Sequence, residues 1–194
     1  MDLFLAISQG IGTSLATGVR TFLVPLLVGA MAGGDIGVDF DGTEYEFLES
    51  TFWLALMLLL LLGAWYVERS DIPVPVAVWA VASAALGGVL FAGSLSEESY
   101  APELGLLGGA LVALIGFGAA RVFLGGATER LAARGETGAA RSLAVVVDIA
   151  TLVFAALALL VSPVSYVGLA FCAWVLMVQR RRAGQKYEGL RILR

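Results

Sequence analysis

The chain has 194 residues, of which 59% are hydrophobic and 14% are charged, and its formal net charge is −4. Soluble domains are nearer a quarter charged, so this composition is typical of a membrane protein in contact with the lipid bilayer. The acidic balance excludes nucleic acid as an expected partner, because no basic surface would face a phosphate backbone. With one cysteine and no histidine in the sequence, we expect no disulfide, no metal site and no cofactor.

Six apolar stretches are each long enough for a transmembrane helix, which needs about 20 apolar residues. Nearly uncharged runs define them, and Ser162-Pro163 indicates a tight turn between the last two. They cover residues 5–32, 50–67, 73–95, 104–126, 142–161 and 164–180. We therefore predict an all-α protein, with a single polytopic membrane domain of six transmembrane helices.

The segments between these stretches differ in the sign of their charge. Residues 35–49 and 97–103 carry acidic side chains and no basic one. Basic residues instead follow the second and fourth stretches and fill the tail 180–194. Because positively charged loops stay in the cytoplasm, we expect an inner-membrane protein with both termini cytoplasmic. Residues 35–49 would then form an acidic extracytoplasmic loop.

Residues 38–45 of this loop read VDFDGTEY and match the D-x-D-G-T loop of haloacid-dehalogenase-type phosphatases. Those enzymes place the motif at the end of a buried strand in a soluble α/β domain, whereas here it would connect two membrane helices. Other enzyme signatures, such as H-E-x-x-H and G-x-S-x-G, are missing. We therefore expect no enzyme and no catalytic residue. The acids are interpreted as a solvated loop, with weak binding of divalent cations as the alternative.

The first stretch is unusually polar for a transmembrane helix. Polar side chains recur along one face at helical spacing, at Gln9, Thr13, Thr17 and Arg20. Small residues form a row beside them, at Gly10, Ser14 and Gly18. Such a row permits close approach by a neighbouring helix. The polar face either lines a substrate pathway or packs against other helices.

The first stretch is also too long. Residues 3–33 would extend roughly 46 Å as one straight helix, against a hydrocarbon core of about 30 Å. The helix must tilt, project from the membrane, or break near Gly18 or at Pro25. Broken helices beside a charge build the substrate sites of several transporters.

Four charged residues lie within the spans or at their ends. Arg20 falls near the middle of the membrane, where an unpaired charge costs about 2.5 to 3.5 kcal/mol. We expect Asp148 in the fifth span to be its partner, with Glu68 as the other candidate. Arg121 would reach water or pair with Glu68. Such residues are functional-site candidates, and a static ion pair between helices is the alternative.

A short sequence recurs in the two halves of the chain. Arg20-Thr-Phe-Leu is repeated as Arg121-Val-Phe-Leu, and a glycine precedes each arginine, at Gly18 and Gly118. This recurrence raises the alternative that the fold consists of two inverted three-helix repeats.

Three stretches together resemble a family of bacterial integral membrane proteins catalogued as domain-of-unknown-function family 4126. They are GIGTSLATGVRTFLVPLLVG, WYVERSDIP and SLAVVVDIATLVFAALALLVSP. The matching positions are Gly10, Gly12, Ser14, Ala16, Gly18 and Arg20, then Glu68 with Ile72-Pro73, then Asp148. The acidic loop around Asp39 departs from the family pattern. The resemblance implies a polytopic membrane protein and assigns no activity.

These observations predict a small transporter or translocator of an anionic solute or a lipid headgroup, which acts through a buried cluster of these arginine, aspartate and glutamate side chains. Arg20 would contact the anion and Asp148 would be its counter-charge. The candidate substrate-binding residues are Arg20, Asp148, Glu68, Arg121, Gln9, Thr13 and Thr17. The alternative is a non-catalytic membrane scaffold or assembly partner that packs through its small-residue helix faces. Expected partners are an anionic small molecule or lipid and, as a further option, a second copy of the chain.

Overall fold

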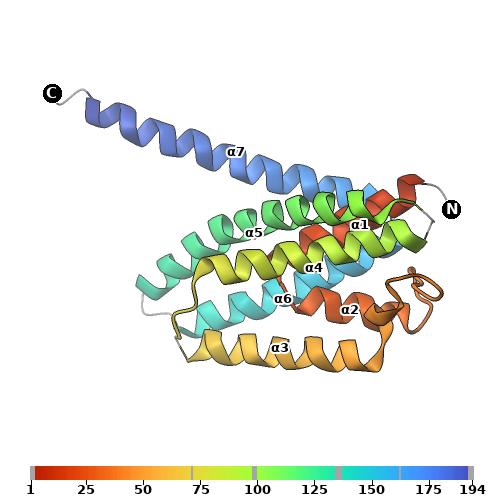
Figure 1. Cartoon of the computed structure of the whole chain (residues 1–194). Coiled ribbons are helices and arrows are strands. Elements are labelled where there is room, and N and C mark those ends of the chain that lie inside the picture. The colour runs from red at the N-terminus through yellow and green to blue at the C-terminus, as the bar shows by residue number, and fades with distance from the viewer. Residues whose placement is uncertain (1–2, 71, 98–99, 134–136, 162, 192–194) are drawn as a thin grey trace.

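In the computed structural model, the described residues are 3–70, 72–97, 100–133, 137–161 and 163–191. Within these ranges the chain is helical and contains no strand, which confirms the all-α prediction. Figure 1 shows the elements as an elongated bundle from which the last helix diverges. The elements are α1 (Leu3–Val19), α2 (Leu23–Ala32), the 3-10 helix η1 (Glu46–Glu49), α3 (Thr51–Arg69), α4 (Val76–Glu97), α5 (Pro102–Ala133), α6 (Thr137–Leu160) and α7 (Pro163–Arg191).

Five helices of the described chain are long and apolar enough to cross a membrane, as expected for a multi-pass membrane protein. They are Thr51–Arg69, Val76–Glu97, Pro102–Ala127, Ser142–Leu160 and Pro163–Arg181. The predicted first span, residues 5–32, is not one helix but the two short helices α1 and α2, of 17 and 10 residues. Six spans are therefore not confirmed.

The chain reverses direction between α1 and α2. The Gln9 side-chain amide donates to the carbonyls of Gly37 (2.8 Å) and Leu159 (3.0 Å), so the first half of α1 lies beside the loop that follows α2. Gly29, on α2, lies against the backbone of Leu48 in the same region. α1 and α2 thus form a hairpin that enters the bundle and returns to the same end (Figure 1). A hairpin accommodates a stretch that is too long to cross once.

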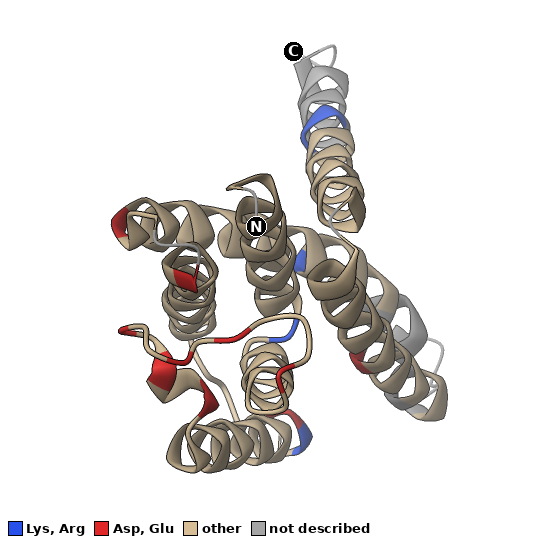
Figure 2. Ribbon diagram, turned by 90° about the vertical axis from the view of Figure 1, so that its right-hand side faces the viewer, with Lys and Arg blue, Asp and Glu red and all other residues tan. Residues whose placement is uncertain are grey.

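The two ends of the bundle differ in charge. We name the end with the loop 33–50 the acidic end, and Figure 2 views the bundle from this end, with Asp and Glu gathered on its loops. The opposite end carries Arg69 at the end of α3, and we name it the basic end. α1 begins at the acidic end, and α7 leaves the bundle toward the basic end (Figure 1). The prediction that both termini lie on one side of the membrane is therefore not confirmed.

α1 packs closely against α4 and α5. The Ser14 hydroxyl donates to the carbonyl of Gly87 on α4 at 2.7 Å. A Cβ atom added at Gly18 would lie 2.1 Å from the carbonyl oxygen of Ala113 on α5, and one added at Gly10 would lie 2.0 Å from the Phe91 ring. These contacts confirm that the small-residue row permits close approach.

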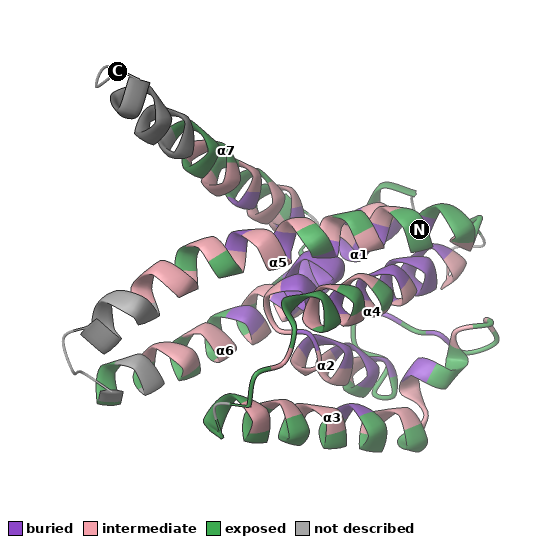
Figure 3. Cartoon of the chain, turned by 60° about the vertical axis from the view of Figure 1, so that its left-hand side comes forward, coloured by how far each residue is buried: buried purple, intermediate pink, exposed green. Residues whose placement is uncertain are grey.

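α3 lies at the edge of the bundle. Only Met57 of this helix is buried, and most of its surface is exposed (Figure 3). Within the described chain, α3 packs against α2 and η1 and makes no comparable contact with α5 or α6. α2 also packs against α6, so the hairpin fills the space between α3 and α6. Because the hairpin turns back before the basic end, it fills that space only in the acidic half.

The acidic loop is anchored in the core by apolar side chains. Phe40 and Leu48 are fully buried, and they pack with Val28 of α2. The VDFDGTEY stretch is closed by local hydrogen bonds, from the Asp41 N–H to the Asp39 carboxylate (2.8 Å) and from the Thr43 hydroxyl to the Phe40 carbonyl (2.8 Å). The D-x-D-G-T motif therefore lies in a helix-connecting turn, not at the end of a strand.

The recurrent four-residue sequence does not adopt one structure twice. Arg20 lies where the helix breaks, whereas Arg121 lies inside the continuous helix α5. Two inverted three-helix repeats are therefore not confirmed.

Candidate functional site

A cavity of about 640 Å³ lies on the basic side of the hairpin turn. It occupies the space between α3, α5 and α6 that the hairpin leaves empty. Its lining includes the turn residues, the second half of α3, the start of α4 and parts of α5 and α6. All four charged residues singled out from the sequence line this cavity, namely Arg20, Glu68, Arg121 and Asp148.

The turn is fixed to α4 by its own residues. α1 ends at Val19, although the Arg20 N–H still donates to the Ala16 carbonyl at 2.9 Å. The hydroxyl of Thr21 shares a hydrogen bond of 2.7 Å with that of Ser83, and the Phe22 ring packs 6.0 Å from the Trp79 ring. The position of Arg20 is therefore determined by the folded bundle and not by a loose loop.

Helix ends also favour this position for a positive charge and a bound anion. Arg20 follows the C-terminus of α1, where the helix dipole stabilises a cation. α2 begins at Leu23 with no side-chain cap on its N-terminus, and Leu23 lines the cavity. The N-terminus of a helix carries partial positive charge and unpaired N–H groups, so it adds to the attraction for an anion.

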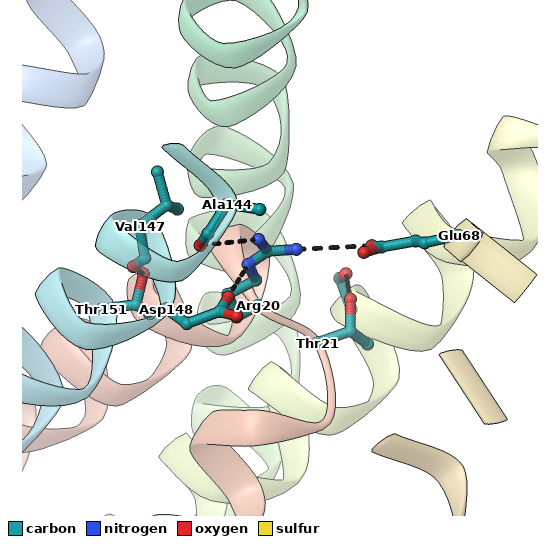
Figure 4. Close-up of polar contacts among 8 residues, drawn as sticks. Arg20, Thr21, Glu68, Ala144, Val147, Asp148 and Thr151 are labelled. Carbon is teal, nitrogen blue, oxygen red and sulfur yellow. Dashed lines mark hydrogen bonds and ion pairs between the residues drawn. The ribbon is translucent and has the colours of Figure 1, made fainter. Parts of the chain in front are cut away.

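The Arg20 guanidinium has three partners, which Figure 4 shows on two sides of the side chain. Nε forms an ion pair with Oδ1 of Asp148, and Nη2 donates to the carbonyl of Ala144 at 3.3 Å, both on α6. On the other side, Nη1 donates to Oε1 of Glu68 on α3 at 3.3 Å. Asp148 is the partner that the sequence predicts first, and Glu68 is the other candidate.

The two acidic partners differ in their surroundings. The Asp148 side chain is 16% exposed and that of Arg20 is 19% exposed, whereas the Glu68 side chain is 53% exposed. Glu68 also lies on the edge helix α3. Asp148 is therefore the more enclosed partner of the guanidinium, and Glu68 is the more exposed one. None of the four charged residues is buried, so the expectation of a buried charged cluster is wrong for this chain alone.

Arg121 faces the same cavity from α5. Its side chain is exposed, and its guanidinium carbon lies 5.8 Å from the centre of the Phe117 ring. No ion pair joins it to Glu68 or to any other acidic residue whose side chain the structure describes. Of the two sequence expectations for Arg121, the pair with Glu68 is therefore absent.

The remaining predicted site residues lie outside the cavity. Gln9, Thr13 and Thr17 are buried, with exposed fractions of 4%, 1% and 0%. The Thr13 and Thr17 hydroxyls donate to backbone carbonyls of their own helix at 2.8 Å, and Gln9 joins α1 to the loop and α6. The structure supports the packing interpretation of this polar face.

Sequence reasoning missed the apolar walls of the cavity. Trp65 of α3, Trp79 of α4 and Ile149 of α6 all line it. A polarity pattern identifies only charged and polar side chains. From the sequence, these three apolar residues are therefore expected to face lipid like the others of their spans. Only the empty space left by the hairpin distinguishes them from other apolar residues of the spans.

Three carboxylates of the acidic loop lie together, far along the bundle from this cavity. Oxygens of Asp39, Asp41 and Glu49 lie within 4.8 Å of one another. Burial raises the pKa of the Glu49 carboxyl, and the charges of Asp41 and Asp39 raise it further. The cluster is therefore a site of charge repulsion at neutral pH.

Comparison with family models, with curated proteins and with solved structures finds no match to this chain. The resemblance to domain-of-unknown-function family 4126 therefore stays a prediction.

Proposed function

We propose that this protein is a small membrane transporter or translocator that binds an anionic group, either a solute or a lipid headgroup, at Arg20. The observation that carries the proposal is a guanidinium at a helix reversal, facing a cavity of about 640 Å³. Charged groups within membrane segments are costly and mark ion and substrate paths in many proteins. A helix break beside a charge is a recurrent substrate site in transporters.

Binding proceeds by exchange of partners at Arg20. Asp148 and the Ala144 carbonyl hold the guanidinium on α6, while Glu68 occupies the side that an anion would take. An incoming anion displaces Glu68, whose side chain is already half exposed and moves into water. Arg121, also in the lining, raises the local concentration of anions by its charge.

Passage to the acidic end requires the hairpin to move. Between the turn and the acidic end, the space is closed by the buried side chains of Val24, Val28 and Leu48. The hairpin and its contacts with α3 and α6 therefore form the barrier, and rocking of this element would expose Arg20 to the other side. Because arginine is in excess in the segments of the basic end, this end faces the cytoplasm of an inner membrane.

The alternative of a scaffold has less support. Its small-residue faces were expected to bind another protein, but Gly10, Gly18 and Gly87 contact helices of the same chain. These faces are therefore not available to a partner. Their closeness to neighbouring backbones accounts for the glycines without any assembly role.

Translocation is tested with the purified protein in sealed phosphatidylcholine vesicles, with uptake of radiolabelled orthophosphate and movement of headgroup-labelled phosphatidylglycerol as the two probes. We expect at least one probe to cross faster than in protein-free vesicles, and Arg20→Gln to abolish the increase. Arg69→Gln is the matched control, because Arg69 also lies near the basic end but does not line the cavity. If neither probe crosses, or if Arg20→Gln retains the full rate, the proposal is wrong.

A further inference from the structure

The cavity opens sideways through apolar side chains. Trp65 on α3 is 56% exposed, and Val145 and Ile149 on α6 are 53% and 56% exposed, although all three line the cavity. α3 and α6 make no close packing with each other in the described chain. In a membrane, exposed apolar residues on spanning helices face lipid. The opening between α3 and α6 therefore communicates with the bilayer.

The guanidinium lies well inside that opening. Asp148 is six residues beyond Ser142, where the apolar part of α6 begins, which places it about 9 Å along the helix axis. A soluble anion that entered from the side would lose its water while passing an apolar rim, and this desolvation is unfavourable. An amphiphile that is already in the bilayer pays little of this cost, because its chains match the rim and its headgroup reaches Arg20.

The size of the cavity agrees with partial entry. A volume of about 640 Å³ is typical of sites for small ligands and accommodates a headgroup and the first part of a chain. The rest of the chains would stay between α3 and α6 in the bilayer. Leu61, Ala64 and Leu152 provide apolar contacts for the part that enters.

We propose that the ligand of this site is an anionic phospholipid that enters sideways between α3 and α6 and places its phosphate on Arg20 in exchange for Glu68. This inference rests on the proposed role of Arg20 as the anion contact, and it chooses the lipid over the soluble anion. Charge complementarity and the apolar rim together carry it. Glu68 acts as a tethered competitor that leaves when the phosphate arrives.

The four tryptophans permit a direct measurement of which lipid occupies the cavity. Trp65 and Trp79 line it, whereas Trp53 and Trp174 do not. A variant with Trp53→Phe and Trp174→Phe reports on the cavity, and a variant that retains only Trp174 reports on bulk lipid around α7. Each is placed in phosphatidylcholine nanodiscs containing an equal fraction of chain-brominated phosphatidylglycerol or chain-brominated phosphatidylcholine. Quenching by each brominated lipid is compared.

We expect the cavity tryptophans to indicate an about fivefold preference for phosphatidylglycerol over phosphatidylcholine. This ratio corresponds to about 1 kcal/mol, the attraction of one basic residue to an anionic lipid surface. The variant that retains only Trp174 should show no such preference. Arg20→Gln should remove the preference, and Glu68→Gln should increase it because the competing carboxylate is gone. Ala64→Phe should also remove it by filling the apolar part of the cavity while every charge remains.

The outcomes separate this inference from the proposed function. Equal quenching by the two lipids, or a preference that survives both Arg20→Gln and Ala64→Phe, overturns the lipid assignment. If orthophosphate uptake in vesicles nevertheless depends on Arg20, the transporter proposal stands with a soluble anion as its substrate. If the lipid preference is present and no probe crosses, the site binds lipid and translocation is wrong. Glu68→Gln keeps the pair of Arg20 with Asp148, so the test does not depend on the stability of Arg20→Gln.

Discussion

The two sides of the hairpin are packed in different ways. On one side, α1 meets α4 and α5 so closely that a methyl group at Gly18 would lie 2.1 Å from a backbone oxygen. On the other side, α3 packs closely against α2 and η1 and against no other helix of the described chain, and the basic half of the space between α3 and α6 is a cavity. Both sides carry polar groups from the same stretch of sequence.

Packing decides whether a polar residue of this membrane protein is sealed inside the fold or accessible to a ligand. On the close-packed side, Thr13 and Thr17 satisfy their hydroxyls within their own helix and are sealed from any ligand. At the turn, Arg20 lies at the boundary of the cavity with one fixed and one exposed partner. Polar side chains stabilise the fold on the first side, whereas the polar side chain of Arg20 is accessible from the cavity on the second side.

The largest effect is expected for filling the close-packed side. Gly18→Leu forces α1 away from α5, and overpacking of this kind costs about 1 to 3 kcal/mol and occasionally more. We expect a much lower midpoint of thermal unfolding in detergent, or loss of the folded protein. Gly63→Leu is the matched control, because nothing lies within 4 Å of a Cβ atom at that helical position. Equal losses for both variants would contradict the contrast between the two sides.

The next effect compares the two partners of Arg20. In double-mutant cycles of thermal stability, we expect Arg20 to couple to Asp148 by about 2 kcal/mol, as for contacting residues in one network. Coupling to Glu68 should be under about 1 kcal/mol, because exposed ion pairs contribute little. Asp148→Asn and Glu68→Gln provide the single variants. A coupling to Glu68 as strong as that to Asp148 would show that neither carboxylate is free to leave.

Accessibility to water should differ along the hairpin. In a Cys172→Ala background, cysteines at Gln9, Thr13 and Thr17 should remain unlabelled by a water-soluble thiol reagent in native membranes, because these positions are buried. A cysteine at Glu68, whose side chain is half exposed, should react. Reaction at all three α1 positions would restore the interpretation of the polar face as a pathway.

The smallest effect concerns pH and the acidic loop. Burial and the neighbouring acids raise the pKa of Glu49 above its usual 4.5. A carboxyl whose pKa is raised by folding stabilises the folded state below its unfolded pKa, and this contribution is lost as pH rises through the folded value. Glu49→Gln should therefore be more stable than the parent at pH 7, with a difference that shrinks near pH 4. A difference that is independent of pH would exclude charge repulsion as its cause.

The spans from α3 to α7 could be predicted because each is a long and nearly uncharged run between charged segments. The reversal in the first stretch could not, because α1 and α2 are both apolar enough to be read as parts of one crossing. Its excess length indicated a break or a tilt, and the structure has the break two residues after Gly18. Length alone does not give the direction in which the chain continues. The orientation predicted for the amino terminus assumed one crossing of this stretch, and it is not confirmed.

The charged part of the candidate site was easier to predict than its shape. Arg20 in a membrane stretch requires an acid, and few acids lie within the spans, so Asp148 and Glu68 were the natural partners. The cavity depends on where α2 ends relative to α3 and α6, which no local pattern encodes. The helical spacing of Gln9, Thr13 and Thr17 predicts that they share one face of a helix. It does not predict which neighbouring element covers that face.

The chain turns back at Arg20, and the side of the membrane on which three single cysteines react measures this reversal. In a Cys172→Ala background, single cysteines replace Leu3, Ile36 and Arg181, all described as exposed, and sealed cells are treated with an impermeant thiol reagent. The account predicts that Leu3→Cys and Ile36→Cys react on the same side of the membrane and that Arg181→Cys reacts only from the other. If Leu3→Cys and Arg181→Cys instead react from one side of the membrane and Ile36→Cys from the other, the first stretch crosses the membrane and the hairpin does not exist.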